Sequence, residues 1–166
     1  MKYIGMIITL IIMVIVTYIY TSLSKSRNKV RELNKKLDEN LRRRWNLVPK
    51  LVEILNGYSV FEKSVLEKLT TLRNQDFDKF KMEQKINVDD NISKVVGKII
   101  EITENSPEIK ENEAYINLRN QLSKIEITIS ELKKEYKKLI NDYNKKIEKR
   151  PNNLVAILFG FNEERI

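Results

Sequence analysis

The 166-residue chain contains no histidine and no cysteine. Without these residues it cannot form a Cys/His zinc site, a Ser-His-Asp triad, a thiol nucleophile or a disulfide bond. A di-iron bundle site that needs histidine is excluded for the same reason. Only four glycines and three prolines are present, which argues against a turn-rich all-β fold. These absences favour an all-α protein that is not an enzyme, with no catalytic, cofactor-binding or metal-binding residues to nominate.

A long hydrophobic run stands at the N-terminus. Residues 4–20 are almost entirely apolar, and no charge lies between Lys2 and Lys25. As a helix, residues 3–23 would be about 31 Å long, close to the ~30 Å hydrocarbon core of a bilayer. A cleaved signal peptide is the alternative, but the run exceeds the usual length of its apolar segment. We therefore predict a transmembrane anchor at residues 1–23 that meets the lipid bilayer through residues 4–20.

Positive charge flanks this run unequally. Only Lys2 and the α-amino group precede it, whereas several basic residues follow closely, namely Lys25, Arg27, Lys29, Arg31, Lys35 and Lys36. The positive-inside rule then places the N-terminus outside and residues 24–166 in the cytoplasm.

Apolar residues near the C-terminus recur three and four positions apart without interruption. They are Tyr115, Leu118, Leu122, Ile125, Ile129, Leu132, Tyr136, Leu139 and Tyr143. Such a seam is typical of a long helix that packs against others at a shallow angle. Ser106 and Pro107 are a helix-start signal, and Pro151 marks its end. One long helix is predicted between them.

A second apolar stripe extends from about Ser24 to Asn74. Its spacings are mostly three or four, and Trp45 falls on it. Pro49 interrupts the pattern, but no short loop stands there, so we expect a kink rather than a reversal, with a break as the alternative. The stripe predicts one long helix with Trp45 in its core face.

The segments around these two helices are shorter. Residues 76–90 are polar and predict a loop, with a short turn around Phe77 and Phe80. A helix is predicted from Asp90 to about Asn105. The apolar tail at residues 154–161 is too short to span a membrane. We expect it to close the end of the bundle, the alternative being that it docks on another surface.

Two groups of residues resemble the motifs of the LemA family of bacterial membrane-anchored helical proteins. The first is a basic–aromatic–Asn–Leu–Val–Pro run followed by Gly-Tyr and a glutamate, and the second is a pair of tyrosines followed by a proline and a Gly-Phe ending. The matching residues are Arg43, Arg44, Trp45, Asn46, Leu47, Pro49, Gly57, Tyr58 and Glu62 in the first group, and Tyr136, Tyr143, Asn144, Pro151, Gly160 and Phe161 in the second. Phe61 stands where the family carries a histidine before the glutamate, so no role that needs histidine is implied.

The resemblance implies a single-pass protein of the bacterial inner membrane. Its expected architecture is an N-terminal transmembrane helix followed by an elongated antiparallel bundle of the four-helix up-and-down type. The periodicity supplies three long helices plus a short fourth, whose origin could be the break at Pro49, the turn near Phe77 or the tail. The family has no settled biochemical activity, so it informs placement more than mechanism.

Two basic patches bear on the choice of function. Residues 42–44 combine three arginines with the adjacent Trp45, and residues 133–150 form a basic helix face. The net charge of +8 is dispersed along the chain and accompanies no nucleic-acid-binding motif, which disfavours nucleic acid as a partner. We interpret the arginines as a solvated helix face.

The sequence therefore predicts a membrane-anchored helical bundle that acts as a scaffold or protein-interaction module. We expect it to bind an unidentified membrane or cytoplasmic protein or to form a homo-oligomer. The alternative is a basic helical surface that binds polyanions, either anionic lipid or nucleic acid, at the membrane.

Overall fold

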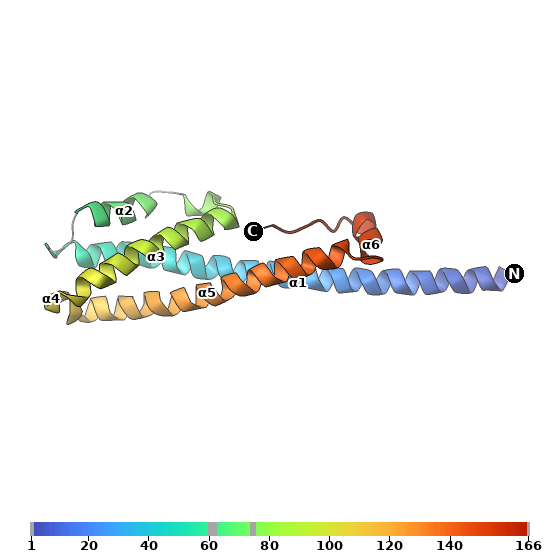
Figure 1. Cartoon of the computed structure of the whole chain (residues 1–166), viewed down its shortest axis with the longest axis horizontal. Coiled ribbons are helices and arrows are strands. Elements are labelled where there is room, and N and C mark those ends of the chain that lie inside the picture. Colours follow the sequence, from blue (N-terminus) through green and yellow to red (C-terminus); the bar gives the residue numbers. More distant parts are fainter. Residues whose placement is uncertain (1, 60–62, 74–75, 166) are drawn as a thin grey trace. The chain divides into compact units, whose positions relative to one another are not determined.

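The computed structural model describes residues 2–59, 63–73 and 76–165, and these residues form helices and no strands. Figure 1 shows the elements, which are α1 (Lys2–Leu55), α2 (Lys63–Arg73), the short 3₁₀ helix η1 (Phe77–Lys79), α3 (Met82–Glu104), α4 (Pro107–Lys110), α5 (Glu113–Glu148) and α6 (Asn152–Phe159). The predicted all-α fold is confirmed.

The chain divides into two compact units. The terminal unit comprises Met1–Asn34 and Lys134–Ile166, and the central unit comprises Lys35–Lys133. Helices α1 and α5 therefore contribute to both units. The boundary expected at residue 23 separates a membrane anchor from a helical bundle, which is a different division from these two units, and it stays a prediction.

The central unit has one apolar core to which α1 to α5 all contribute. Its buried residues are Val48, Leu51, Leu55, Leu69, Val88, Ile92, Val96, Ile99, Ile109, Tyr115, Leu118 and Leu122. Within this unit α2 and α5 run opposite to α1 and α3, and α2 lies against α3 (Figure 1). Five helices, α1 to α5, therefore share the core, and α2 and the short α4 are the two that the periodicity did not predict as separate helices.

The predicted helix from Ser24 to Asn74 is wrong in its second half. α1 continues through Pro49 and ends at Leu55, and α2 begins only at Lys63. The missing N–H of a proline inside a helix costs about 3 kcal/mol. Burial of neighbouring Val48 and Leu51 in the core opposes that cost. The chain changes direction between the end of α1 at Leu55 and the start of α2 at Lys63, where the apolar stripe predicted a continuous helix.

Two further boundaries differ from the prediction. α3 begins at Met82 rather than Asp90, so the loop predicted at residues 76–90 is wrong from Met82 onward, although the turn near Phe77 and Phe80 is confirmed. Ser106 and Pro107 do start a helix, but that helix is the short α4, and α5 begins separately at Glu113. Asn112 explains the new start, because its side-chain oxygen accepts a hydrogen bond (3.0 Å) from the backbone N–H of Tyr115.

The seam predicted for α5 is confirmed. Tyr115, Leu118, Leu122, Ile129, Tyr136 and Tyr143 are buried, and the three remaining seam residues are half-buried. The side with charged residues faces outward along most of the helix. Periodicity alone was sufficient for this element because its apolar and charged faces are cleanly separated.

In the terminal unit α6 covers part of α1. Val155, Ala156 and Phe161 are buried, so one side of the apolar tail closes on the unit as expected. The other side is exposed and carries large apolar side chains. The first part of α1 is also exposed and apolar, and α1 is long and apolar enough there to cross a membrane by length and composition.

Candidate functional site

A buried ion pair joins α1 to α3 in the central unit. The Arg44 side chain is only 1% exposed, and its Nη1 donates to Asp89 Oδ1 (2.9 Å) and to Ser93 Oγ (2.8 Å). Lys133 of α5 donates through Nζ to the other Asp89 oxygen, Oδ2, at 2.8 Å. The Asp89 carboxylate is thus shared by cations from two other helices, and it connects α1, α3 and α5.

Two more carboxylates complete what we call the ion-pair cluster, which consists of Arg44, Asp89, Asp90, Glu126 and Lys133. Lys133 Nζ also donates to Asp90 Oδ1 at 2.8 Å. Arg44 Nη2 lies 3.4 Å from Glu126 Oε1, within ion-pair range but without hydrogen-bond geometry. Among the described residues, Arg44 Nε and Nη2 therefore lack a hydrogen-bond partner.

The electrostatics of the cluster stabilise its charged form. Burial alone would lower the pKa of Lys133, but hydrogen bonds and charge interactions with Asp89 and Asp90 outweigh burial and raise that pKa above its ordinary value. Removing one partner of a buried ion pair typically costs about 3–5 kcal/mol, because the remaining charge is left without compensation. The arrangement is suited to holding three helices in register.

The first motif group places its neighbours around this cluster. Trp45 stacks on Phe77, with ring centroids 5.1 Å apart. It was expected in the core face of the helix and is half-buried. Arg42 forms an exposed ion pair with Asp78 (2.6 Å), and Arg43 is exposed. The interpretation of the three arginines as one solvated face is therefore wrong for Arg44, which lies on the buried side of α1.

The rest of the first motif group lies toward the end of α1. Asn46 and Gly57 are exposed, while Leu47 and Pro49 are half-buried. Tyr58 accepts a hydrogen bond at its Oη from Asn112 Nδ2 (2.9 Å), the same asparagine that caps α5. The Gly-Tyr pair thus connects the end of α1 to the start of α5, and Glu62 lies outside the described residues.

The second motif group gathers in the terminal unit, where Asn144 holds the C-terminal segment. Its Nδ2 donates to the Glu164 backbone oxygen (2.9 Å), and its Oδ1 accepts from the Glu164 N–H (3.0 Å). Tyr136 and Tyr143 are buried on the same helix. Burial, supported by the nearby Glu164 carboxylate, raises the pKa of Tyr136.

Gly160 and Phe161 end α6. Gly160 has the left-handed conformation (φ 68°), and the Phe161 N–H donates to the Ala156 oxygen (2.9 Å), which is the closure expected of a glycine C-cap. The Phe161 ring then packs on Tyr20 (5.5 Å between centroids) and under the Arg27 guanidinium (4.7 Å to its centroid). Pro151 is exposed and immediately precedes α6.

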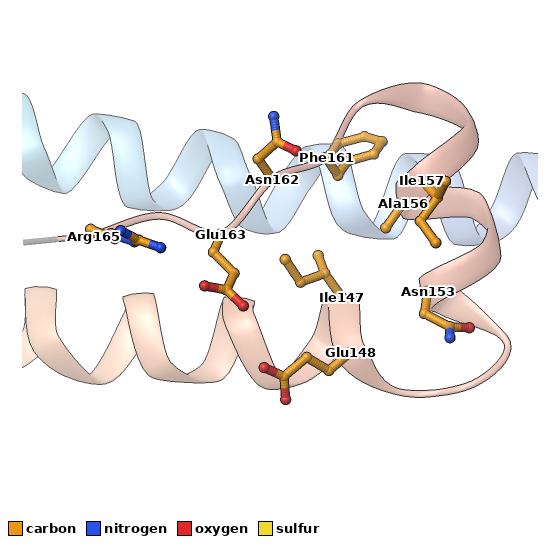
Figure 2. A pocket seen from close by; sticks show the side chains of 9 residues that line it. All are labelled: Ile147, Glu148, Asn153, Ala156, Ile157, Phe161, Asn162, Glu163 and Arg165. Carbon is orange, nitrogen blue, oxygen red and sulfur yellow. The ribbon is translucent and has the colours of Figure 1, made fainter.

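An open pocket of about 470 Å³ lies between the end of α5, α6 and the C-terminal segment. Figure 2 shows Ile147, Ala156 and Phe161 as its apolar lining and Glu148 and Glu163 as charged neighbours. Arg165 also lines the pocket, so two carboxylates and one guanidinium are its charged groups. Within the described part of the chain, no group of three acidic residues is placed to hold a metal ion.

The fold and these contacts define a class: an all-α protein with a candidate membrane-spanning N-terminal segment and helices joined by buried ion pairs. Within that class, the chain belongs to the LemA family, whose family model matches residues 33–166. No curated protein sequence matches the chain significantly. The family assignment predicted from the two motif groups is confirmed.

Proposed function

We propose that this LemA-family chain is a single-pass membrane protein whose helical part acts as a scaffold for protein interaction and carries no catalytic activity. The observation that supports this proposal is the change of character along α1. Its large apolar side chains between Tyr3 and Ile15 are exposed, whereas Val30, Leu33 and Leu37 are buried. One helix thus combines a lipid-compatible segment with a packed segment.

The exposed segment favours a membrane environment. Soluble proteins rarely expose contiguous apolar patches larger than a few hundred Å². In α1 the exposed apolar side chains include Tyr3, Ile7, Ile11 and Val14, and no charged residue interrupts them. Insertion into a bilayer removes this surface from water, while the helix satisfies its own backbone hydrogen bonds.

The ion-pair cluster supports a scaffold rather than an acid–base site. Both oxygens of the Asp89 carboxylate are occupied by cations, and Arg44 is enclosed by three helices. Buried and paired in this way, Asp89 and Arg44 hold helices together and present no exposed proton donor or acceptor to a substrate. The surface available for interaction is then the outer face of the bundle, which includes the exposed Ile127 of α5.

The polyanion-binding alternative finds some support in the terminal unit. Arg42, Arg44 and Lys133, which belonged to the two basic patches, are engaged by carboxylates of the protein itself. The exposed lysines beyond Lys133 include Lys138 and Lys145. Binding of an anionic surface would therefore depend on this end of α5 rather than on the arginines.

Topology can be tested with single cysteines, because the chain has none of its own. In full-length chains, Lys2→Cys should react with a membrane-impermeant maleimide in intact cells, since the N-terminus is proposed to lie outside. Glu111→Cys, in the exposed connection between α4 and α5, should react only after permeabilisation. The opposite labelling pattern would show that the bundle faces away from the cytoplasm.

Protein interaction can be tested by photo-crosslinking from the membrane-embedded full chain. A photoreactive residue at Ile127, which is 59% exposed, should give a reproducible adduct with another protein or a second copy. A photoreactive residue at Gln121, which is exposed on the same helix, provides a second crosslinking position for comparison with Ile127. The scaffold proposal loses its basis if neither position gives an adduct in repeated experiments.

A further inference from the structure

The α6 helix exposes an apolar face that the rest of the protein does not cover. Leu154 is 67% exposed, Ile157 80% and Leu158 73%, and their spacing of three and four places them on one side of the helix. We call these three residues the α6 face. Val155 and Ala156 are buried against the terminal unit. The helix is therefore apolar on both sides, which is uncommon for a short surface helix.

The α6 helix lies beside the end of the apolar run in α1. The Phe159 ring packs on Tyr20, with centroids 5.0 Å apart, and the Phe161 ring contacts the same tyrosine. Ile19 and Leu23 are buried whereas Tyr20 and Thr21 are exposed, so the rest of the terminal unit covers one face of α1 from this level onward. Figure 1 shows α6 next to α1 at this position. Tyrosine is a residue that favours the membrane–water boundary.

The length of the uncovered segment adds a quantitative argument. The side chains of α1 are exposed from Tyr3 to Tyr18, apart from the partly exposed Val16. At 1.5 Å per residue this segment is about 24 Å long, which is shorter than the ~30 Å hydrocarbon core. An apolar surface from another element would make up the difference, and α6 stands at the end where the uncovered segment stops.

The charges beside α6 match an anionic membrane surface. Lys145 near the end of α5, Lys149 and Arg150 just after it, and Lys25 on α1 are all exposed. Basic residues close to a membrane span attract anionic headgroups, and their long side chains can reach the headgroup level while an apolar neighbour lies deeper.

We propose that α6 is an interfacial helix that buries the α6 face at the boundary between headgroups and acyl chains, in the leaflet that the C-terminal end of the membrane span reaches. The inference rests on the proposed membrane anchor and adds a second lipid contact to it. Helices of this kind lie in the plane of the interface with their apolar side inserted by about 5–10 Å.

Depth-dependent fluorescence quenching tests this contact. The full-length chain, with single substitutions Ile157→Cys, Val14→Cys or Asn141→Cys, is labelled with an environment-sensitive thiol probe and placed in phosphatidylcholine–phosphatidylglycerol vesicles. Nitroxide quenchers are attached either high or low on the lipid acyl chains. All three positions are exposed, so labelling leaves the packing intact.

We expect the probe at Ile157 to show blue-shifted emission and stronger quenching by the shallow nitroxide than by the deep one. The Val14 probe should be quenched more by the deep nitroxide, and the Asn141 probe by neither. If Val14 is quenched and Ile157 is not, the inference is overturned and the anchor stands. If Val14 is not quenched, the anchor proposal itself is contradicted, and the inference with it.

A second copy is the competing occupant of the α6 face. In that case the Ile157 probe would be blue-shifted but unquenched by either lipid, and oxidation of unlabelled Ile157→Cys chains would give a disulfide-linked dimer. That result would also overturn the membrane contact. Oxidation of the Asn141→Cys chain provides the control for random collisions between copies.

Discussion

The two units of the chain are each stabilised by a different kind of internal contact. The central unit places charge inside, where Arg44 and Asp89 are enclosed by three helices. The terminal unit places aromatic rings and backbone-directed amides at its contacts, as in the packing of Phe161 on Tyr20 and the pairing of Asn144 with Glu164. It also leaves large apolar side chains outside.

This difference corresponds to the two motif groups. The first group supplies Arg44 and Tyr58 to the central unit, and the second supplies Asn144, Gly160 and Phe161 to the terminal unit. Each group therefore serves the packing of one unit. A buried ion pair is favourable only when its geometry and its additional hydrogen bonds are good. Aromatic rings can pack in several offset or edge-to-face arrangements, so the contacts of the terminal unit are less demanding. The unit with the apolar exterior is the one that contains the candidate membrane span.

The largest expected effect comes from breaking the ion-pair cluster. Asp89→Ala should lower the free energy of unfolding by about 3–5 kcal/mol, because Arg44 and Lys133 lose the carboxylate between them. Asp90→Ala is the matched control: it is exposed, contacts only the Lys133 end of the cluster and should cost no more than about 1 kcal/mol. Denaturant unfolding of the full chain in detergent, followed by circular dichroism, measures both.

A rescue experiment distinguishes charge from packing. In the Asp89→Ala background, Arg44→Met removes the buried cation that was left unpaired and should restore part of the lost stability. Equal losses for Asp89→Ala and Asp90→Ala would contradict the central role of Asp89. A double variant less stable than Asp89→Ala would indicate that the Arg44 guanidinium still stabilises the fold through Ser93 and Glu126.

The charged residues of the central unit were predictable in position but not in partnership. Leu37, Leu41, Arg44, Val48 and Leu51 alternate by four and three, so Arg44 occupies a seam position that the prediction assigned to its neighbour. Periodicity cannot assign a charged residue to the core unless a partner is known, because an unpaired buried charge is too costly. The partner lies on another helix, and its identity depends on tertiary packing.

The same reasoning explains the missed start of α3. Its buried face begins with Lys85, Val88 and Asp89 before Ile92 and Val96 continue it, so two of its first three buried residues are charged and the apolar signal that marks a helix is weak there. Lys85 pairs with Asp38 of α1. In contrast, the α5 seam was fully predictable, since every seam residue is apolar. In the terminal unit the C-terminal segment depends on Asn144, whose backbone partner cannot be identified from sequence.

A smaller effect is expected in the terminal unit. Asn144→Ala removes both hydrogen bonds to the Glu164 backbone and should cost about 1–2 kcal/mol. Because the loss is local, amide hydrogen exchange should accelerate in residues 161–165 while the central unit stays protected. Asn141→Ala, at an exposed position on the same helix, should leave exchange in that segment unchanged. Faster exchange throughout the central unit would show that the two units unfold together.

Two glycines should respond with opposite signs to the same substitution. Gly160→Ala forces a side chain into the left-handed conformation at φ 68° and should destabilise the end of α6 by about 1–2 kcal/mol. Gly97 lies within α3 with open space around its Cβ position, so Gly97→Ala should stabilise the chain by about 0.5–1 kcal/mol. Thermal unfolding of both variants measures the signs, and a stabilising Gly160→Ala would contradict the role of the glycine cap.

The smallest effect at neutral pH is expected for Tyr143→Phe, because the buried Tyr143 hydroxyl has no hydrogen-bond partner among the described residues. By comparison, Tyr115→Phe in the central unit removes a bond to Thr103 (2.6 Å) and should cost about 1 kcal/mol. The Tyr143 variant differs from the parent at alkaline pH. Burial raises the pKa of Tyr143, an effect that Arg27 and Arg31 oppose and Glu164 supports.

The sign of the pH effect follows from proton binding. As the pH rises through the ordinary tyrosine pKa of about 10, the unfolded chain loses the Tyr143 proton first, so the folded chain binds more protons and its stability falls. Tyr143→Phe removes this contribution and should show a shallower loss of unfolding free energy above about pH 10. Parallel curves for variant and parent would mean that ionisation of Tyr143 does not oppose folding.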